Sequence, residues 1–402
     1  MNTPSSDPAT LDSAPPSEAG ATREAQRSHA GGAEATLSER GRRPPLPEFQ
    51  ARLLDPPLQT AELPGIGGRI RMRPEDFAVR EIPAYGPDGR EGAHLLLTLQ
   101  KCGIGSEDAI AEVSRQTGIP RPEIGLAGLK DKDAITEQWI SIPFAAGPRL
   151  AQFSHPAITL GPTYPHGNKL RRGHLHGNHF SIVVRELADS GEPAEHVRRI
   201  LAKRSRLAEL GGLDNLYGSQ RLGDDGSNLR RGLEFLAAGA RRGRADFLLS
   251  AGQSALFNLY LLERRARGLL RTVLAGDILK KTETGGIFES REPEVDQTRL
   301  EAGELGITGP MFGSKMRAPS SGTAADALER EILERTGISP EALKALGRKA
   351  EGTRRPLQLP ITDLQVAEAP GTDALPPGLC LQFSLPAGSY ATVLLQELQG
   401  PR

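Results

Sequence analysis

One short polar segment of this sequence groups side chains that carry acid–base or nucleophilic chemistry. Asp131 comes soon after the apolar run 124–127, and Lys130 and Lys132 lie on either side of it. Gln138 follows a few residues later. A carboxylate beside cations has its ionised form favoured, which suits a nucleophile or a general base. The same pattern is typical of a charged loop in which an aspartate caps a turn. The spacing alone leaves both interpretations open.

Other sequence signatures of chemistry are missing. We find no Gly-rich phosphate loop, no dinucleotide-binding fingerprint, no nucleophile elbow and no metal-ligand spacing of Cys and His. Four of the eight histidines are crowded into one segment, at His166, His174, His176 and His179. Because no Cys or carboxylate accompanies them, an RNA-facing or solvated loop is a better interpretation than zinc binding. We expect neither a metal nor a cofactor.

The helices and strands predicted around Asp131 indicate an α+β domain with a mainly antiparallel sheet. A helix is predicted with Ser106 as its N-cap, with acidic residues in its first turn, and with a stop at Gly118 and Pro120. Asp131 then falls on a tight polar loop between two predicted strands. Apolar runs and alternation predict strands around 77–79 and over residues 94–99, 124–127, 138–142 and 180–184.

After Gly211 the pattern changes to helices joined by Gly-rich connections. Helices are predicted over residues 245–267, 324–335 and 340–346. The last segment predicts a strand over 381–385 and a helix over 390–398, which we expect to rejoin the first sheet. The middle region is then an insertion. We predict a first domain made of residues 48–211 and 359–402, and an inserted domain made of residues 212–358.

Composition excludes several classes of protein. The chain has 402 residues, 37% of them hydrophobic and 25% charged, which suits a globular protein of two domains. No apolar run approaches the roughly 18 residues that a membrane-spanning helix needs, and no secretory signal is visible. Cys102 and Cys380 are too few for a disulfide framework or a zinc cluster. We therefore expect a cytoplasmic protein without a membrane partner, and a monomer because no coiled-coil pattern is present.

Residues 1–47 differ from the rest of the chain. They are rich in Pro, Ser, Ala and Gly with almost no aliphatic side chains, which predicts a disordered tail. Six acidic residues in this segment argue against a mitochondrial transit peptide.

The positive charges are clustered although the formal net charge is zero. Forty of the 50 cations are Arg, and the guanidinium group binds phosphate through two parallel hydrogen bonds. Clusters of this kind indicate either a local footprint for RNA or solvated helix faces. The clusters lie at residues 169–174, 198–206, 241–244, 264–267 and 354–355.

Ordered sequence blocks indicate a known family. Segment 128–138 (GLKDKDAITEQ) closely resembles the central motif of the TruD family, the tRNA pseudouridine(13) synthases. Six further blocks match in the family's order, and the resemblance covers roughly residues 69–400. These blocks are 73–81 (RPEDFAVRE), 177–180 (GNHF), 215–223 (NLYGSQRLG), 308–313 (TGPMFG), 352–356 (GTRRP) and 383–392 (FSLPAGSYAT).

The resemblance implies an isomerase that acts on a uridine in tRNA. The glycosidic bond breaks, the base turns and a carbon–carbon bond forms, so neither a redox cofactor nor a metal is required. It implies a pseudouridine-synthase-like catalytic domain, with a mainly antiparallel mixed sheet flanked by helices, and an inserted smaller α/β (TRUD) domain at the boundaries given above. It also implies that Asp131 is the catalytic aspartate.

Substrate-binding residues follow from the resemblance position by position. Asn178 and Phe180 occupy the family's Asn-x-Phe positions, and residues two apart on a strand face the same side. In relatives that side lines the uridine pocket, and the aromatic ring stacks on the base. Without the resemblance, Phe180 would be ordinary core beside Ile182 and Val184. We predict that Asn178 and Phe180 contact the substrate.

Further contacts are implied for cationic and amide side chains. Arg71 stands where many relatives carry Lys, and a cation there keeps Asp131 ionised. Lys130 and Gln138 belong to the central motif and are predicted to contact the substrate. Gln220 and Arg221 suit phosphate or sugar contacts. Arg354 and Arg355 fit either phosphate binding or pairing between the two domains.

Two other functions stay open from the sequence. One is an RNA-binding or RNA-remodelling protein that keeps the fold while catalysis has faded, although the Lys130–Asp131 pair and Gln138 argue against it. The other is a hydrolase of glycosides or nucleosides. That class normally needs a second well-placed carboxylate and aromatic sugar platforms, and the chain has one Trp and five Tyr. We predict an isomerase whose partner is tRNA.

Overall fold

The computed structural model describes residues 48–401, except residues 90, 189–190, 224 and 240–245. The predicted tail at 1–47 and the Arg cluster at 241–244 fall outside the described residues. Among the described residues, no helix is both long and apolar enough to cross a membrane.

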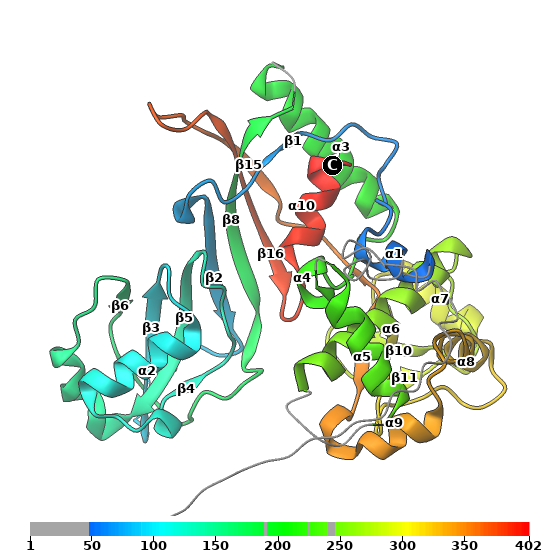
Figure 1. Cartoon of the computed structure of the whole chain (residues 1–402), viewed down its shortest axis with the longest axis horizontal. Coiled ribbons are helices and arrows are strands. Elements are labelled where there is room, and N and C mark those ends of the chain that lie inside the picture. Colours follow the sequence, from blue (N-terminus) through cyan, green and yellow to red (C-terminus); the bar gives the residue numbers. More distant parts are fainter. Residues whose placement is uncertain (1–47, 90, 189–190, 224, 240–245, 402) are drawn as a thin grey trace, which may run out of the picture. The chain divides into compact units, whose positions relative to one another are not determined.

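Within the described residues, ten strands form one large mixed sheet (Figure 1). The strand order is β15–β16–β8–β2–β5–β3–β6, while β1 pairs with β8, β4 with β5 and β7 with β3. β2 and β5 run parallel, and the other neighbouring strands are antiparallel. The strands are β1 (Gly67–Arg69), β2 (Phe77–Pro83), β3 (His94–Lys101), β4 (Gly125–Leu126), β5 (Ile135–Pro143), β6 (Ile158–Leu160), β7 (Tyr164–His166), β8 (Leu175–Leu187), β15 (Gln365–Ala369) and β16 (Gly378–Pro386).

The middle of the chain builds a smaller antiparallel sheet with the order β11–β10–β12–β13. β9 and β14 form a separate short pair where the chain enters and leaves this region. These strands are β9 (Leu213–Asp214), β10 (Ile278–Lys281), β11 (Ile287–Glu289), β12 (Leu305–Met311), β13 (Thr353–Pro356) and β14 (Gln358–Leu359).

Helices cover both sheets. The buried apolar side chains of α2 pack on β3 and β5, and those of α3 and α10 pack on β8 and β16. Helices α5, α6, α8 and α9 share one core with β10 and β12. The helices are α1 (Glu48–Leu54), α2 (Ser106–Thr117), α3 (Pro193–Glu209), α4 (Ser219–Leu222), α5 (Ser227–Ala237), α6 (Asp246–Ala266), α7 (Pro293–Glu301), α8 (Ala324–Thr336), α9 (Pro340–Leu346) and α10 (Ala391–Gln399).

Local sequence signals give the right boundaries for several elements. The N-cap prediction for Ser106 was wrong by one residue: Gly105 is the N-cap of α2, and the Ser106 hydroxyl bonds Gln138 instead. The predicted stop is confirmed, because α2 ends at Thr117 and Gly118 takes the left-handed conformation with φ 67° that glycine adopts without steric cost. Ser339 caps α9 by accepting a hydrogen bond from the backbone N–H of Ala342. The predicted α+β class with a mainly antiparallel sheet and a second, smaller α/β region is confirmed.

The last predicted strand rejoins the first sheet, as expected. β16 pairs with β8 along its whole length, from Gly378 opposite Arg185 to Pro386 opposite Gly177. The sequence did not predict α3. Its apolar residues are interrupted by the Arg-rich run 198–206, so the charge pattern hid the buried stripe of the helix.

The register of the sheet sets side chains from distant segments next to each other. On β8, Phe180 lies opposite Val79 of β2 on one side and opposite Phe383 of β16 on the other. Two residues along, Asn178 lies opposite Glu81. Because directly opposed residues share a face, these side chains form two neighbouring rows on one face of the sheet.

Candidate active site

A cavity of about 260 Å³ lies where β2 and β8 meet the 128–133 loop and the start of α10. Six of the eight predicted site residues line this cavity. They are Arg71, Lys130, Asp131, Asn178, Phe180 and Gln220. Segment 388–392, which joins β16 to α10, supplies further lining residues. The topology thus brings five separated parts of the sequence to one site.

Gln138 lies beneath the 128–133 loop and is not among the lining residues. Its Oε1 accepts a hydrogen bond from Ser106 Oγ at 2.7 Å, and its Nε2 contacts the Gly128 carbonyl at 3.4 Å. Ser106 Oγ also accepts a hydrogen bond from the Lys130 backbone N–H at 2.9 Å. Gln138 is fully buried, so these contacts fix the loop and leave its amide no access to the cavity.

Lys101 also holds the 128–133 loop in place. Its ammonium group donates a hydrogen bond to the backbone carbonyl of Asp131 at 2.6 Å. Lys101 is buried, and burial lowers the pKa of its ammonium group. With the Asp131 backbone held in this way, the carboxylate lies at the open side of the cavity, where its side chain is 56% exposed.

Arg71 holds the Asp131 carboxylate from the opposite side. Arg71 Nη2 lies 2.9 Å from Asp131 Oδ2, and the Arg71 side chain is 26% exposed. Its guanidinium carbon lies 4.2 Å from the ring centroid of Phe77, which restricts its orientation. The Arg71 backbone has a φ of 60°, which is uncommon for a residue with a side chain. The pair is a charge-assisted hydrogen bond at the mouth of the cavity.

A buried chain of hydrogen bonds lies behind Lys130 and Asn178, which both line the cavity. Lys130 Nζ donates to Glu81 Oε2 at 2.6 Å and to Asn178 Oδ1 at 2.8 Å. Glu81 Oε1 accepts the Trp139 backbone N–H at 3.2 Å. In the sequence, Glu81 stood only within the block 73–81, with no catalytic or binding role assigned to it. Glu81 is two residues from Val79, so both side chains face the same, inward side of β2. This spacing could have revealed the role of Glu81, because an inward-facing carboxylate needs a partner.

Phe180 belongs both to the core and to the cavity. It packs in the same apolar cluster as Ile182 and Val184, which matches the interpretation as ordinary core. It also lines the cavity, and its ring stacks on Phe383 with centroids 5.3 Å apart and an angle of 23° between the planes. A ring fixed from behind in this way offers its free surface to a flat ligand.

The two predicted residues of α4 face different surroundings. Gln220 lines the cavity. Arg221 does not line it; the guanidinium contacts Ser250 Oγ and lies 5.3 Å from the ring centroid of Phe247. Tyr390, which sequence reasoning did not assign, lines the cavity, and burial raises the pKa of its hydroxyl.

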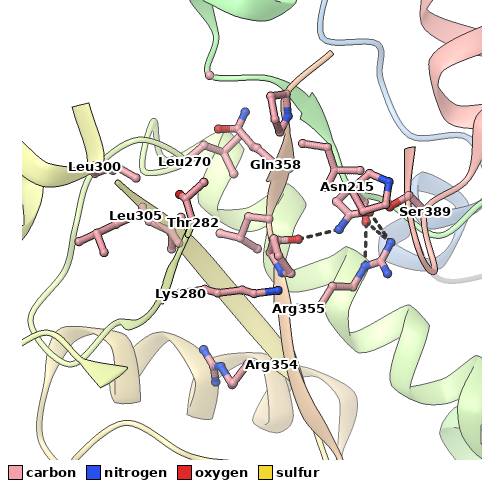
Figure 2. Close-up of a pocket in the computed structure, with 18 of the residues that line it drawn as sticks. Asn215, Leu270, Lys280, Thr282, Leu300, Leu305, Arg354, Arg355, Gln358 and Ser389 are labelled. Carbon is pink, nitrogen blue, oxygen red and sulfur yellow. Dashed lines mark hydrogen bonds between the residues drawn. The ribbon is translucent and has the colours of Figure 1, made fainter. Parts of the chain in front are cut away.

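A second, larger cavity has a volume of about 630 Å³ (Figure 2). It adjoins the first, since Ser389 lines both. It lies against β10, β12 and β13, and segment 386–389 closes one side. None of the described residues that line it is Asp or Glu. The cationic residues that line it are Arg271, Lys280, Lys281, Arg354 and Arg355.

Arg355 joins the smaller sheet to segment 386–389. It donates to the carbonyl oxygens of Asn215 and Gly388, at 3.0 and 2.9 Å, and its guanidinium carbon lies 4.2 Å from the Tyr217 ring centroid. Burial lowers the pKa of Arg355, and it forms no ion pair with a described carboxylate. Arg354 is buried too and pairs with Glu329 at 2.7 Å. Both contact sets favour a structural role for these arginines.

Among the described residues, most arginines of the predicted clusters form ion pairs within the molecule. Their guanidinium groups pair with carboxylates of the same or a neighbouring element, so little of this charge is free for RNA. Lys280 and Lys281, which lie outside those clusters, have no ion pair with a described residue. The pairs include Arg172–Glu107, Arg198–Glu195, Arg206–Glu62, Arg264–Asp277, Arg265–Asp214 and Arg267–Glu263.

The described part of the chain contains no group of three His, Cys, Asp or Glu side chains placed to hold a metal ion. The crowded histidines have other neighbours. His166 stacks on Tyr85 with ring centroids 5.0 Å apart, and His174 Nδ1 lies 2.6 Å from the Tyr85 hydroxyl.

Comparison with known proteins identifies the family and agrees with this fold. The family described as "tRNA pseudouridine synthase D (TruD)" matches residues 55–232 and 244–398. A protein named tRNA pseudouridine synthase D from Anaeromyxobacter sp. strain Fw109-5 is 43% identical over 355 residues, covering 86% of this chain and 96% of the relative. A protein of the same name from Thermus thermophilus is 41% identical over 346 residues, covering 85% of this chain and 91% of the relative.

A solved structure supports the fold. The crystal structure of a TruD protein from Methanosarcina mazei matches with a TM-score of 0.66 and 22% identity, covering 88% of this chain and 98% of the other. The molecule therefore has the two-region fold of the pseudouridine synthase D proteins. The chain belongs to the TruD family.

Proposed function

We propose that this protein is a tRNA pseudouridine synthase that converts a uridine of tRNA, at position 13, to pseudouridine. The reaction breaks the bond between C1′ and N1, forms a bond between C1′ and C5, and transfers the hydrogen of C5 to solvent while N1 gains one. Product and substrate have the same atoms, so the conversion needs no oxidant and no added water. The names of the relatives at 41–43% identity support this activity.

One observation supports the chemical assignment most strongly. The Asp131 carboxylate, its Arg71 partner and the Phe180 ring all line one cavity. We infer that a pyrimidine turned out of the RNA stack enters this cavity and stacks on Phe180. Asp131 then acts on the nucleoside as nucleophile or base, and Arg71 orients it.

We infer different roles for the other predicted residues. Lys130, Asn178 and Gln220 line the cavity and are proposed to contact the nucleotide. Gln138 and Arg221 do not line it, and we propose that they act on the site through the 128–133 loop and through α4.

We propose that the larger cavity binds the backbone of the tRNA. Three of its cationic residues, Arg271, Lys280 and Lys281, form no ion pair with a described residue, and no described carboxylate lines it. It also shares Ser389 with the smaller cavity. Phosphates there would be continuous with a nucleotide whose base occupies the smaller cavity. Binding by such contacts weakens steeply as salt is added.

The proposal includes the division of the chain into two domains. We propose a catalytic domain of residues 48–211 and 359–402 and an inserted TRUD domain of residues 212–358. The separation of the two larger sheets, with the β9–β14 pair between them in sequence, supports these boundaries. We further propose that the protein acts as a monomer in the cytoplasm, where tRNA is its partner.

The test is to incubate the protein with tRNA and to map pseudouridine by chemical labelling. We expect product with the wild type and with Asp133→Asn, and none with Asp131→Asn. Asp133 is a matched control because it is an exposed carboxylate of the same loop outside the cavity lining. RNA binding without product would instead indicate the faded RNA-binding protein, and release of free uracil would indicate a hydrolase.

A further inference from the structure

The contact with Lys130 fixes which end of the Asn178 amide faces the cavity. An ammonium group only donates hydrogen bonds, so the Asn178 atom 2.8 Å from Lys130 Nζ is the acceptor Oδ1. The Nδ2 amino group is then directed elsewhere and has no hydrogen-bond partner among the described residues. Because Asn178 lines the cavity, it offers a ligand a donor and not an acceptor.

Glu81 makes this orientation stable. Its carboxylate holds Lys130 at 2.6 Å and is itself fixed by the Trp139 backbone N–H. The Glu81 side chain has no exposed surface and that of Lys130 is 5% exposed, so water cannot replace these contacts freely. A flip of the Asn178 amide would set its amino group against the ammonium group, two donors facing each other. Glu81 is thus a positioning residue for Asn178.

The exposure of the side chains defines the two ends of the cavity. Asp131 and Arg71 are partly exposed and mark the open end. Lys130 lines the cavity, is 5% exposed and marks the buried end, with the fully buried Glu81 behind it and Asn178 in contact with it. A base that enters while still attached to RNA keeps its ribose at the open end. The ring atom opposite the glycosidic atom therefore reaches the buried end. In a uracil attached through N1, that atom is C4, which carries the O4 carbonyl.

We propose that Asn178 Nδ2 donates a hydrogen bond to the carbonyl opposite the glycosidic atom and so selects uracil against cytosine. This inference rests on the proposed function. Cytosine carries an amino group at C4, which would meet a second donor at Asn178. When the uracil has turned and is attached through C5, the opposite ring atom is C2, which again carries a carbonyl. One fixed donor therefore holds the base in its substrate and in its product orientation.

The experiment measures the affinity for tRNA with sulfur in place of either carbonyl oxygen. The analogue stands at the uridine that the wild-type protein converts, and Asp131→Asn serves as the background so that no turnover occurs. Sulfur is a weak hydrogen-bond acceptor. We expect 4-thiouridine to weaken binding by about three- to tenfold relative to uridine, the size of one neutral hydrogen bond, and 2-thiouridine to bind as uridine does.

Two further variants assign the effect to Asn178. Asn178→Asp keeps an oxygen for Lys130, so the buried contact is retained while the donor is lost. In this variant we expect the RNAs with uridine and 4-thiouridine to bind equally. His179→Ala is the control, because His179 lies on the opposite face of β8, where it contacts Ser384, and the thio effect should persist there.

Three results would overturn the inference: 4-thiouridine binds as tightly as uridine in the background protein, 2-thiouridine weakens binding equally, or the 4-thio effect survives in Asn178→Asp. Each of these can occur with a wild type that forms pseudouridine, and the proposed function then stands. A wild type that forms no pseudouridine refutes the proposed function and this inference with it.

Discussion

The Arg71 guanidinium lies 2.9 Å from the Asp131 carboxylate although 60 residues separate the two in the chain. Arg71 precedes β2 and Asp131 precedes β5, and these two strands run parallel to each other. The start of each strand therefore lies at the same edge of the sheet. The parallel pair explains how a cation and a carboxylate from different sequence blocks meet at one cavity.

Substitutions of Arg71 should reduce activity to an extent that depends on whether the positive charge is kept. Arg71→Lys keeps the charge and should retain more activity than Arg71→Ala, which we expect to lose about 10- to 100-fold in kcat/KM, the value of one charge-assisted hydrogen bond. The measurement is the rate of pseudouridine formation in tRNA. Arg80→Ala, an exposed change on β2, is the control. Equal rates for wild type and Arg71→Ala would contradict the role of this pair.

Phe180 and Phe383 form a matched pair for testing the stacking role. Both rings belong to the same buried cluster, and Phe180 alone of the two lines the cavity. Phe180→Leu should lower kcat/KM by about 10- to 100-fold, because base–aromatic stacking contributes about 1–3 kcal/mol. Phe383→Leu should lower the free energy of unfolding about as much as Phe180→Leu does. Its effect on kcat/KM should be much smaller. Thermal unfolding and kinetics of both variants check this, and parallel losses of activity would contradict it.

Lys280 and Lys281 should account for part of the salt dependence of tRNA binding. The double change to Ala removes two cations that line the larger cavity and have no ion pair with a described residue. We expect weaker binding and a slope of log affinity against log salt that is smaller by about one for each lost phosphate contact. Lys344→Ala, an exposed change outside both cavities, should leave the slope as it is. An unchanged slope in the double variant would place the RNA backbone elsewhere.

The buried Asp214 on β9 should make stability depend on pH. Burial raises its pKa from 3.8 to about 6, although Arg265 lies 2.9 Å away and opposes the rise. The folded protein therefore binds this proton more tightly than the unfolded chain does. The contribution of Asp214 to the unfolding free energy falls as pH rises from about 4 to about 6, by up to about 3 kcal/mol.

Asp214→Asn removes this titration. Urea unfolding of both proteins between about pH 4 and about pH 7 should show a wild-type stability that declines relative to the variant. Parallel curves would mean that Asp214 does not bind a proton in this range. A wild type that gains stability relative to the variant would contradict the direction of the pKa shift.

Local signals in the sequence determined much of this protein. The glycine stop at Gly118 and the ordered motifs predicted the end of α2 and the family. The spacing of Asn178 and Phe180 placed both on one face of a strand, and the structure sets both against the cavity. Such features depend on residues near each other in the chain, so they are visible without knowledge of the fold.

Tertiary structure decided which charges and amides remain free. Gln138 was predicted to contact the substrate but is buried under its own loop. Glu81 had no catalytic or binding role assigned from the sequence, yet it holds Lys130. The Arg clusters allowed either an RNA footprint or solvated faces, and most of their described members pair internally. Lys280 and Lys281, outside those clusters, line a cavity that contains no described carboxylate. The physical reason is that a side chain's chemistry depends on its partners and its burial. Both are set by contacts between distant segments, which no local pattern records.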